Sequence, residues 1–237
     1  SSTEAENITR EYCDLYDVIA SENLDCNISI KLTHIGLSLD ETIAVNNLER
    51  ILKQVKKHNN FLRIDMENSP YTQDTINLYQ DYVSDYPNMG IVLQAYLKRS
   101  LEDVRTLNGP GFNTRVCKGI YDEPETIAFK DRAAIQDNFF HITKEILSGN
   151  GFAAIATHDI PLIDRIEDWI ESTQVPSDRF EFQVLYGVPM GGRLERLLDK
   201  GYTVRQYVPF GPEWFDYSLR RLKENPKIMS YVLGNLF

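Results

Sequence analysis

The sequence has few of the residues and motifs that mark metal centres, disulfide frameworks and membrane spans. Its 237 residues include three cysteines, Cys13, Cys26 and Cys117, an odd number at wide spacing. This pattern favours reduced thiols and a cytoplasmic location over a disulfide framework. Neither an HExxH nor a CxxC pair occurs, so no metal site is predicted. No apolar run approaches the roughly 18 residues needed to cross a bilayer.

Positive charge is also scarce. Lys and Arg number 25 against 35 Asp and Glu, which gives a formal net charge of −10 at pH 7. Because non-specific nucleic-acid binding depends on neutralising phosphate charge, this balance argues against a nucleic-acid partner. Hydrophobic residues make up 42% and charged residues 25%, as in ordinary globular proteins. The length suits one α/β barrel or one large doubly wound domain.

Segments with the patterns of strands and helices alternate along the chain. Runs rich in β-branched and aromatic residues predict seven strands, at 27–33, 61–67, 90–96, 114–121, 152–157, 180–186 and 203–208. Helices are expected at about 3–20, 38–58, 69–84, 100–107, 131–148, 160–173 and 192–200, followed by an arginine-bearing helix after Gly211 and an apolar helix at 227–236. Such alternation predicts a parallel sheet, either closed into a barrel or doubly wound.

Several of these helices carry capping signals. Thr3 and Glu6 have the spacing of a capping box, and residues 38–41 are expected to cap the second helix. Ser69 before Pro70 predicts an N-cap with proline at the first helical position. The segment at 192–200 is expected to end at a glycine, residue 201.

A barrel is favoured over a doubly wound sheet. A doubly wound nucleotide fold carries a glycine-rich turn after its first strand, and residues 31–36 lack one. We therefore expect one TIM-like (β/α)8 barrel over residues 1–237. A closed barrel needs eight strands, whereas seven are counted after an initial helix. The first strand is therefore expected to be absent, with the domain truncated at its N-terminus.

Polar side chains gather where the predicted strands end, which is the active-site end of such barrels. The set is Lys31, Asp65, Glu67, Gln94, Arg115, Lys118, Thr157, His158, Gln183, Tyr207, Arg220 and Arg221. Most of its charge is positive in an acidic chain, so an anionic ligand is predicted, a carboxylate or a phosphate. Plainer roles stay open for single residues. Lys31 and Asp65 can form an ion pair, Gln94 can satisfy backbone groups, and His158 can cap a helix.

Arg220 and Arg221 stand in the helix expected after the last strand. Neighbouring helical residues point about 100° apart, so the two guanidiniums can spread around one anion. Together they offer the paired donors that a carboxylate or phosphate binds. Taken alone, the pair is better explained as solvated surface residues. Its place after the last strand is what favours a binding role.

Seven stretches of the chain together resemble proline dehydrogenase, in particular the small monofunctional bacterial form and the equivalent domain of bifunctional proline utilisation proteins. They are residues 29–33, 64–67, 92–96, 115–121 (RVCKGIY), 156–159, 181–187 (EFQVLYG) and 207–225, and they occur in family order. The resemblance implies a distorted (β/α)8 barrel that binds FAD non-covalently and oxidises L-proline to Δ1-pyrroline-5-carboxylate by hydride transfer to flavin N5. It also implies a quinone acceptor, functional coupling to pyrroline-5-carboxylate dehydrogenase and at most peripheral contact with the inner membrane.

The resemblance further implies roles for individual residues. Those matched to substrate contacts are Lys31, Arg220 and Arg221 around the proline carboxylate, with Tyr121 and Leu185 against the ring. Those matched to the catalytic centre are Asp65, Arg115 and Tyr207. Those matched to cofactor contacts are Met66, Gln94, Arg115, Lys118, Gly119, Ile120, Thr157, His158 and Glu224. The tyrosine favours proline over 4-hydroxyproline, because relatives that act on the latter carry a smaller residue there.

The chain departs from the family pattern in two places. The family's first strand carries a glutamate that pairs with one of the two arginines, and this chain begins after that position. Ile120 replaces the usual alanine. On the residues alone, two other interpretations stay open. One is another barrel enzyme acting on a phosphorylated or carboxylate substrate, and the other is a non-catalytic relative that binds no flavin.

Overall fold

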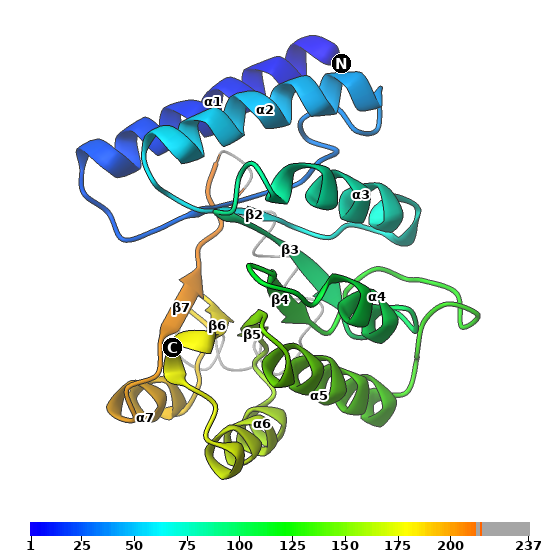
Figure 1. Cartoon of the computed structure of the whole chain (residues 1–237), viewed down its shortest axis with the longest axis vertical. Helices are drawn as coiled ribbons and strands as arrows, with labels where there is room; N and C mark the ends of the chain where they lie inside the picture. The colour runs from blue at the N-terminus through cyan, green and yellow to red at the C-terminus, as the bar shows by residue number, and fades with distance from the viewer. Residues whose placement is uncertain (212–213, 215–237) are drawn as a thin grey trace, which may run out of the picture. The chain divides into compact units, whose positions relative to one another are not determined.

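The computed structural model describes residues 1–211 and Trp214. Helices and strands alternate along them, and the strands belong to one sheet in the order β1-β2-β3-β4-β5-β6-β7 (Figure 1). The chain divides into two compact units, Ser1–Ala153 and Ala154–Phe237. The predicted α/β class is confirmed, and so is each of the seven predicted strands. The helices predicted after Gly211, at the arginine pair and at 227–236, lie outside the described residues.

The first unit contains four complete strands, five helices and one short 3₁₀ turn. In chain order they are α1 (Ser2–Ser21), β1 (Ile28–Ile30), α2 (Glu41–Lys57), β2 (Leu62–Ile64), η1 (Ser69–Tyr71), α3 (Thr72–Val83), β3 (Met89–Gln94), α4 (Ser100–Leu107), β4 (Asn113–Cys117) and α5 (Arg132–Ser148). The helices agree closely with the predicted ranges, because their apolar positions recur at helical spacing and face the sheet.

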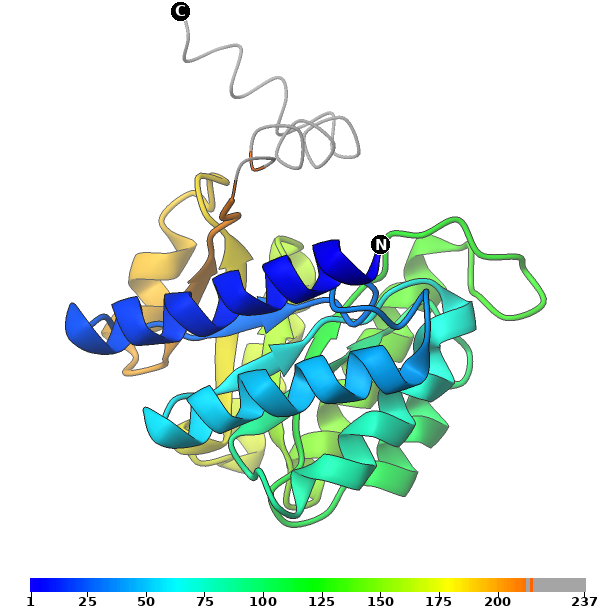
Figure 2. The same cartoon turned by 90° about the horizontal axis from the view of Figure 1, so that it is seen from above.

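Helices α1 and α2 lie side by side (Figure 2). Ser1 caps α1, since its hydroxyl accepts from the Glu4 N–H while the Glu4 carboxylate reaches back to the cap. This is a capping box, but the predicted box at Thr3 and Glu6 is wrong. The earlier serine takes the role because its oxygen already satisfies the N–H three residues on. The cap of α2 is Asp40, within the predicted stretch.

The third helix starts differently from the prediction. Residues 69–71 form the 3₁₀ turn η1, with Asn68 as its N-cap, and α3 follows from Thr72. Pro70 occupies the expected early position, where the missing N–H has no intrahelical partner to lose. Ser69 does not cap the helix, because its N–H and its hydroxyl both donate to Glu123. The predicted cap is therefore used in a long-range contact instead.

The strands of the first unit form a buried parallel ladder. Ile30 lies opposite Ile64, and Ile64 lies opposite Ile91. Every residue of β2 and β3 is buried, as expected for parallel strands covered by helices. Helix α2 adds Leu48 and Ile51, both fully buried, to the same core. Burial of each such side chain contributes about 1.5–3 kcal/mol to the free energy of folding. The strands of this unit are therefore held in place by a well-packed apolar layer.

The strands end earlier than predicted. β1 stops at Ile30, β2 at Ile64 and β4 at Cys117, so the polar residues that follow lie in loops. After β1 the chain turns back at once, with the His34 N–H donating to the Lys31 carbonyl at 3.1 Å. The predicted strand ranges therefore included the first residues of the connecting loops.

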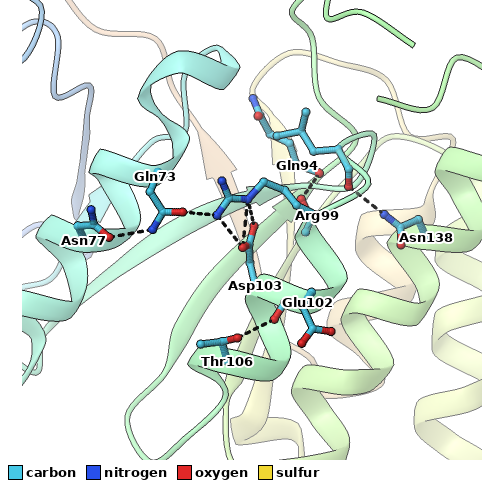
Figure 3. A network of polar contacts seen from close by, with 10 residues as sticks. Gln73, Asn77, Gln94, Arg99, Glu102, Asp103, Thr106 and Asn138 are labelled. Atoms are coloured by element: carbon cyan, nitrogen blue, oxygen red, sulfur yellow. Dashed lines mark hydrogen bonds and ion pairs between the residues drawn. The ribbon is translucent and has the colours of Figure 1, made fainter. Parts of the chain in front are cut away.

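The start of α4 is tied to α3 by a polar network (Figure 3). The Arg99 guanidinium contacts Asp103 through Nε at 2.8 Å and donates to Gln73 Oε1 at 2.6 Å. Gln73 in turn donates to Asn77 at 2.8 Å. This network links α3 to the N-cap of α4, the helix that follows β3.

The second unit contains β5 (Phe152–Ala156, which begins at the end of the first unit), α6 (Ile160–Thr173), η2 (Ser177–Arg179), β6 (Phe180–Leu185), α7 (Arg193–Asp199) and β7 (Val204–Tyr207). β6 and β7 pair in parallel, with Leu185 opposite Tyr207. Gly201 follows α7 at φ +79°, the left-handed conformation expected at a helix stop. None of the helices in the described part of the chain is long and apolar enough to cross a membrane.

Helix α7 is held against α6 by ion pairs around one buried carboxylate. Glu167 on α6 has only 1% of its side chain exposed. The cations around it come from α7 and its C-cap: Arg193 at 3.3 Å, Arg196 at 3.6 Å, and Lys200. A buried carboxylate is tolerated because opposite charges and hydrogen bonds offset its desolvation.

Candidate functional site

The ends of β1, β2 and β4 meet at a buried ion pair. Arg115, in β4, donates through Nη1 to Asp65 Oδ1 at 2.6 Å and through Nη2 to Ser29 Oγ at 3.0 Å. Its side chain therefore crosses β3, which lies between β4 and β2. Both partners are largely buried, with side-chain exposures of 10% for the arginine and 17% for the aspartate. Paired charges at this depth interact strongly and hold a fixed geometry.

Lys31 takes no part in that pair. Its side chain is half-buried just after β1. The other described residues give its ammonium neither a hydrogen bond nor an ion pair, so the suggested Lys31–Asp65 pair is absent from them. The loop that carries it is fixed by Glu67, which accepts from the Thr33 N–H at 3.0 Å and from the Thr33 hydroxyl at 2.6 Å. A cation on a fixed loop is thus left available for an anionic ligand.

Gln94 ends β3 in a fully enclosed position. The residue is 2% exposed, and its Oε1 has no hydrogen-bond partner among the described residues. Its backbone is well held, because the Ser100 hydroxyl donates to the Gln94 carbonyl at 2.6 Å and Asn138 donates to the next carbonyl, Ala95 O, at 2.6 Å (Figure 3). An unsatisfied buried acceptor costs about 1–3 kcal/mol, so it points to a missing ligand. The plainer role, in which this oxygen satisfies a backbone group, is not found.

Residues 118–121 follow the end of β4, and Gly119 among them packs against the ring of Tyr96. The Tyr96 N–H donates to the Lys118 carbonyl at 2.8 Å. Gly119 has φ +102°, and a Cβ at this position would lie 2.1 Å from the Tyr96 ring, so only glycine fits. Ile120 is 54% exposed and Tyr121 is half-buried. The segment therefore presents backbone and two side chains beside the strand ends.

Two further groups lie close to the buried ion pair. Burial raises the pKa of the Cys117 thiol to about 11, against the opposing charge of Arg115. The thiol is therefore protonated at neutral pH and is not a nucleophile. Burial likewise raises the pKa of the Tyr12 phenol, and the carboxylates of Asp65, Glu11 and Glu67 raise it further. Sequence reasoning missed this tyrosine, because nothing in the pattern of α1 connects it to the strand ends.

Met66 follows the aspartate of the ion pair and is 5% exposed. Its thioether is therefore enclosed at the end of β2, where it can pack against a flat ligand. Two polar residues near it, Ser29 and Ser69, were not predicted as site residues, because their contacts are with Arg115 and Glu123, far away in sequence. Among the described residues, no group of three or more His, Cys, Asp or Glu could hold a metal ion.

In the second unit, taken by itself, Thr157 and His158 follow the end of β5. The Thr157 N–H donates to the Gln183 carbonyl at 3.2 Å, and its hydroxyl accepts from the Asp159 N–H at 3.1 Å. His158 Nε2 accepts from the Leu185 N–H at 2.9 Å. His158 therefore does not cap α6, whose N-cap is Asp159. Because Nε2 accepts, the neutral ring carries its proton on Nδ1.

Leu185 and Tyr207 are brought together by the pairing of β6 with β7. They are opposite residues in the register, and the Tyr186 N–H donates to the Tyr207 carbonyl at 2.9 Å. Both side chains are half-buried. An apolar and an aromatic side chain thus lie next to each other at these strand ends. Three other predicted site residues, Arg220, Arg221 and Glu224, lie outside the described part of the chain.

Comparison with known proteins gives a consistent result. The family model described as proline dehydrogenase matches residues 1–232. Proline dehydrogenase 1 of Bacillus subtilis (strain 168) is 36% identical over 237 residues, which cover 100% of this chain and 78% of that protein. Proline dehydrogenase 2 of the same strain is 33% identical over 236 residues, again 100% of this chain and 78% of the relative.

A solved structure shares the fold. Proline utilization A from Bdellovibrio bacteriovorus, inactivated by N-propargylglycine, matches with a TM-score of 0.84 at 23% identity. The match covers 95% of this chain and 28% of that one, so this chain spans less than a third of the larger protein. At this identity the likeness concerns the arrangement of strands and helices.

Proposed function

This chain belongs to the proline dehydrogenase family, and we propose that it oxidises L-proline to Δ1-pyrroline-5-carboxylate with FAD as its cofactor. The observation that carries the proposal is the buried Arg115–Asp65 pair at the strand ends, close in sequence to residues that fit a flavin and a carboxylate. The family match over residues 1–232 includes every predicted site residue. The residues proposed to bind proline and FAD therefore all lie within the matched region.

The residues of the first unit fit a flavin. Gln94 offers a buried, unpartnered amide oxygen, which suits a ring edge that carries an N–H donor. Gly119 keeps the chain close to the Tyr96 ring, and Met66 adds an enclosed apolar surface. When bound, FAD supplies an acceptor for the hydride lost by proline. Lys118 and Ile120, and in the second unit Thr157 and His158, are proposed to hold the rest of the cofactor, together with Glu224.

The charged residues of the first unit would orient substrate and stabilise charge. Lys31 would bind the proline carboxylate, together with Arg220 and Arg221. Arg115 provides a guanidinium whose position is fixed by Asp65 and Ser29, and such preorganised charge is most effective in an enclosed site. Holding the carboxylate in one place makes the oxidation an oriented step.

The proposed apolar contacts set the substrate class. Tyr121 and Leu185 would pack against the proline ring, and Tyr207 would leave no room for a 4-hydroxyl group. We also propose that a quinone reoxidises the cofactor and that a pyrroline-5-carboxylate dehydrogenase takes up the product. We propose, further, that the protein acts in the cytoplasm, with at most peripheral contact with the inner membrane.

A lysine substitution tests the proposal. Lys31→Met keeps the length of the side chain and removes its charge, so we expect KM for L-proline to rise by about tenfold or more while the FAD content stays the same. Initial rates of product formation against proline concentration give KM. Lys53→Met is the matched control, because Lys53 is a surface lysine with 67% of its side chain exposed. A protein that forms no product from L-proline in the presence of FAD and a quinone would contradict the proposal.

A further inference from the structure

Glu123 is a buried carboxylate on a loop in which most of the residues around it are exposed, although Ala128 is buried as well. It is 6% exposed, whereas the side chain of Asp122 next to it is 99% exposed. The loop runs from β4 to α5 and extends beyond α4 in both views (Figure 1, Figure 2). A single enclosed charge on such a loop is unusual, because burying a carboxylate without a cation costs several kcal/mol. No cation of the described residues lies within ion-pair distance of Glu123.

Both oxygens of this carboxylate bind one distant residue. Oε1 accepts from the Ser69 N–H at 2.6 Å, and Oε2 accepts from the Ser69 hydroxyl at 2.6 Å. Ser69 begins η1, shortly after Asp65 and Met66 at the end of β2. The two residues are 54 positions apart in sequence. The contact therefore joins the loop after β4 to the loop after β2.

The segment between β4 and Glu123 is thereby held at both ends. At its start, the Lys118 carbonyl accepts from the Tyr96 N–H at 2.8 Å. At its end stands the Glu123–Ser69 contact. Burial raises the pKa of the Tyr96 phenol, and the charge of Glu123 raises it further. The carboxylate therefore lies near the ring on which Gly119 rests.

The later part of the loop is anchored separately. The Phe129 N–H donates to the Tyr96 carbonyl at 2.7 Å, and the Lys98 N–H donates to the Ile127 carbonyl at 2.9 Å. These contacts are to the loop after β3. They do not replace the link from Glu123 to the end of β2. Within residues 119–122, the Asp122 carboxylate also pairs with Lys130 at 2.8 Å, but that contact stays within the same loop.

We propose that Glu123 is a positioning residue, which holds residues 118–121 in the course that binds FAD. This inference rests on the proposed function, because it concerns the same cofactor segment. Glu123 acts through the chain that it holds and touches neither substrate nor reacting atoms. This role requires a side chain at position 123 that accepts from the Ser69 N–H and forms one further hydrogen bond with the Ser69 hydroxyl. A glutamine can supply both, since its Oε1 accepts and its Nε2 donates to the hydroxyl oxygen.

FAD binding to the full chain tests the proposal directly. We expect Glu123→Ala to raise the Kd for FAD by about tenfold, since a displaced segment loses hydrogen bonds worth about 1–2 kcal/mol to the cofactor. Glu123→Gln should restore the Kd to within about threefold of wild type. Glu125→Ala is the matched control, because it removes the same charge from an exposed position in the same loop.

A second measurement separates positioning from general stability. Hydrogen exchange of the apo-protein should be faster for the amides of residues 118–123 in Glu123→Ala and unchanged in α2 and β3. If Glu123→Ala does not fold, Ser69→Ala removes one of the two hydrogen bonds and should raise the Kd for FAD by about threefold to tenfold.

Three results would overturn the inference while leaving the proposed function intact. The first is a wild-type protein that binds FAD and oxidises proline while Glu123→Ala, or Ser69→Ala in its place, binds FAD as tightly as wild type. The second is a Glu123→Gln variant as impaired as Glu123→Ala, because the charge and not the hydrogen-bond geometry would then be required. The third is an equal loss of affinity in Glu125→Ala. A wild-type protein that binds no FAD contradicts the proposed function itself, and the inference with it.

Discussion

The two units bury glutamates in opposite ways. In the first unit, Glu67 and Glu123 each accept one N–H and one hydroxyl hydrogen bond from a single Thr or Ser. In the second unit, Glu167 lies among three cations of α7 and its C-cap. In the first unit, N–H and hydroxyl donors hold the two glutamates, and no cation takes part. In the second unit, the cations of α7 and its C-cap pair with a glutamate of α6. In the first unit, the ammonium of Lys31 therefore has no ion-pair partner among the described residues.

The difference also shows what each contact is for. Hydrogen bonds to neutral groups are directional and define where a loop runs. Ion pairs between helices are less directional, and they offset the cost of burying Glu167 while holding α7 to α6. The first arrangement is suited to positioning site residues, and the second to holding a structural layer together.

The largest effect is expected from breaking the buried Arg115–Asp65 ion pair of the first unit. Arg115→Met should lower kcat/KM for L-proline by about 100-fold to 1000-fold, because it removes preorganised charge. It should also lower the free energy of unfolding by about 3–5 kcal/mol, because Asp65 loses the opposite charge of the Arg115 guanidinium. Steady-state rates and urea unfolding measure the two effects. Arg105→Met is the control, since the side chain of Arg105 is 52% exposed, and a loss of equal size there would remove the argument for a site.

The next effect separates the two kinds of buried glutamate. Glu167→Gln should lower the free energy of unfolding by about 3 kcal/mol, because the cations around it lose their counter-charge. Glu67→Gln should change it by less than about 1 kcal/mol, because an amide can still bond the N–H and the hydroxyl of Thr33. Urea unfolding of both variants gives the comparison. Equal losses would show that Glu67 also depends on its charge.

A smaller effect is expected from the hydroxyl in the Glu67 contact. Thr33→Val keeps the shape of the side chain and the backbone N–H, and it removes one hydrogen bond, worth about 1–2 kcal/mol beside a charged acceptor. Because the loop of Lys31 loosens, KM for L-proline should rise severalfold with little change in kcat. Thr106→Val is the control, since its hydroxyl bonds only within its own exposed helix turn. A fall in kcat without a change in KM would argue against a role in substrate binding.

The smallest effect on stability is expected at Asp17, an exposed carboxylate that Lys57 and His58 contact. Hydrogen bonds from Lys57 and His58 hold the pKa of Asp17 below its ordinary value of 3.8. Because the folded-state pKa is the lower one, the stabilisation is present above pH 3.8 and is lost as the pH falls through the folded-state value. Urea unfolding between pH 5 and about pH 2 should show this slope, and Asp17→Asn should reduce it. If the free energy of unfolding falls with pH equally steeply in the variant, other carboxylates cause the acid sensitivity.

Much of the fold could be predicted because its signals are local. Strands and helices of the described residues follow from periodicity, and Gly201 marks a helix stop as expected. The errors have local causes too. The predicted cap at Ser69 was wrong because a buried glutamate 54 residues away takes both of its donors. Single-sequence patterns hold no information about a contact at that separation.

The sequence predicted which residues belong to the candidate site better than it predicted which of them contact one another. Polar residues at strand ends pointed to the set, and the family resemblance is confirmed by the match over residues 1–232. The partner of Asp65 could not be read from the sequence. Lys31 follows β1, the strand next to β2, whereas Arg115 is in β4, two strands away, and both are cations. Only the register of the sheet decides that Arg115 reaches it. The roles of the individual residues toward proline and FAD stay predictions.

Oxidation of L-proline by a bound flavin can be followed in one spectroscopic titration. The full chain is loaded with FAD, freed of oxygen and titrated with L-proline while the visible spectrum is recorded. We expect the flavin absorbance bands to be bleached in proportion to the proline added, and we expect Lys31→Met to need about tenfold more proline for the same bleaching. A protein that holds FAD and keeps an unchanged spectrum at saturating L-proline would contradict the account.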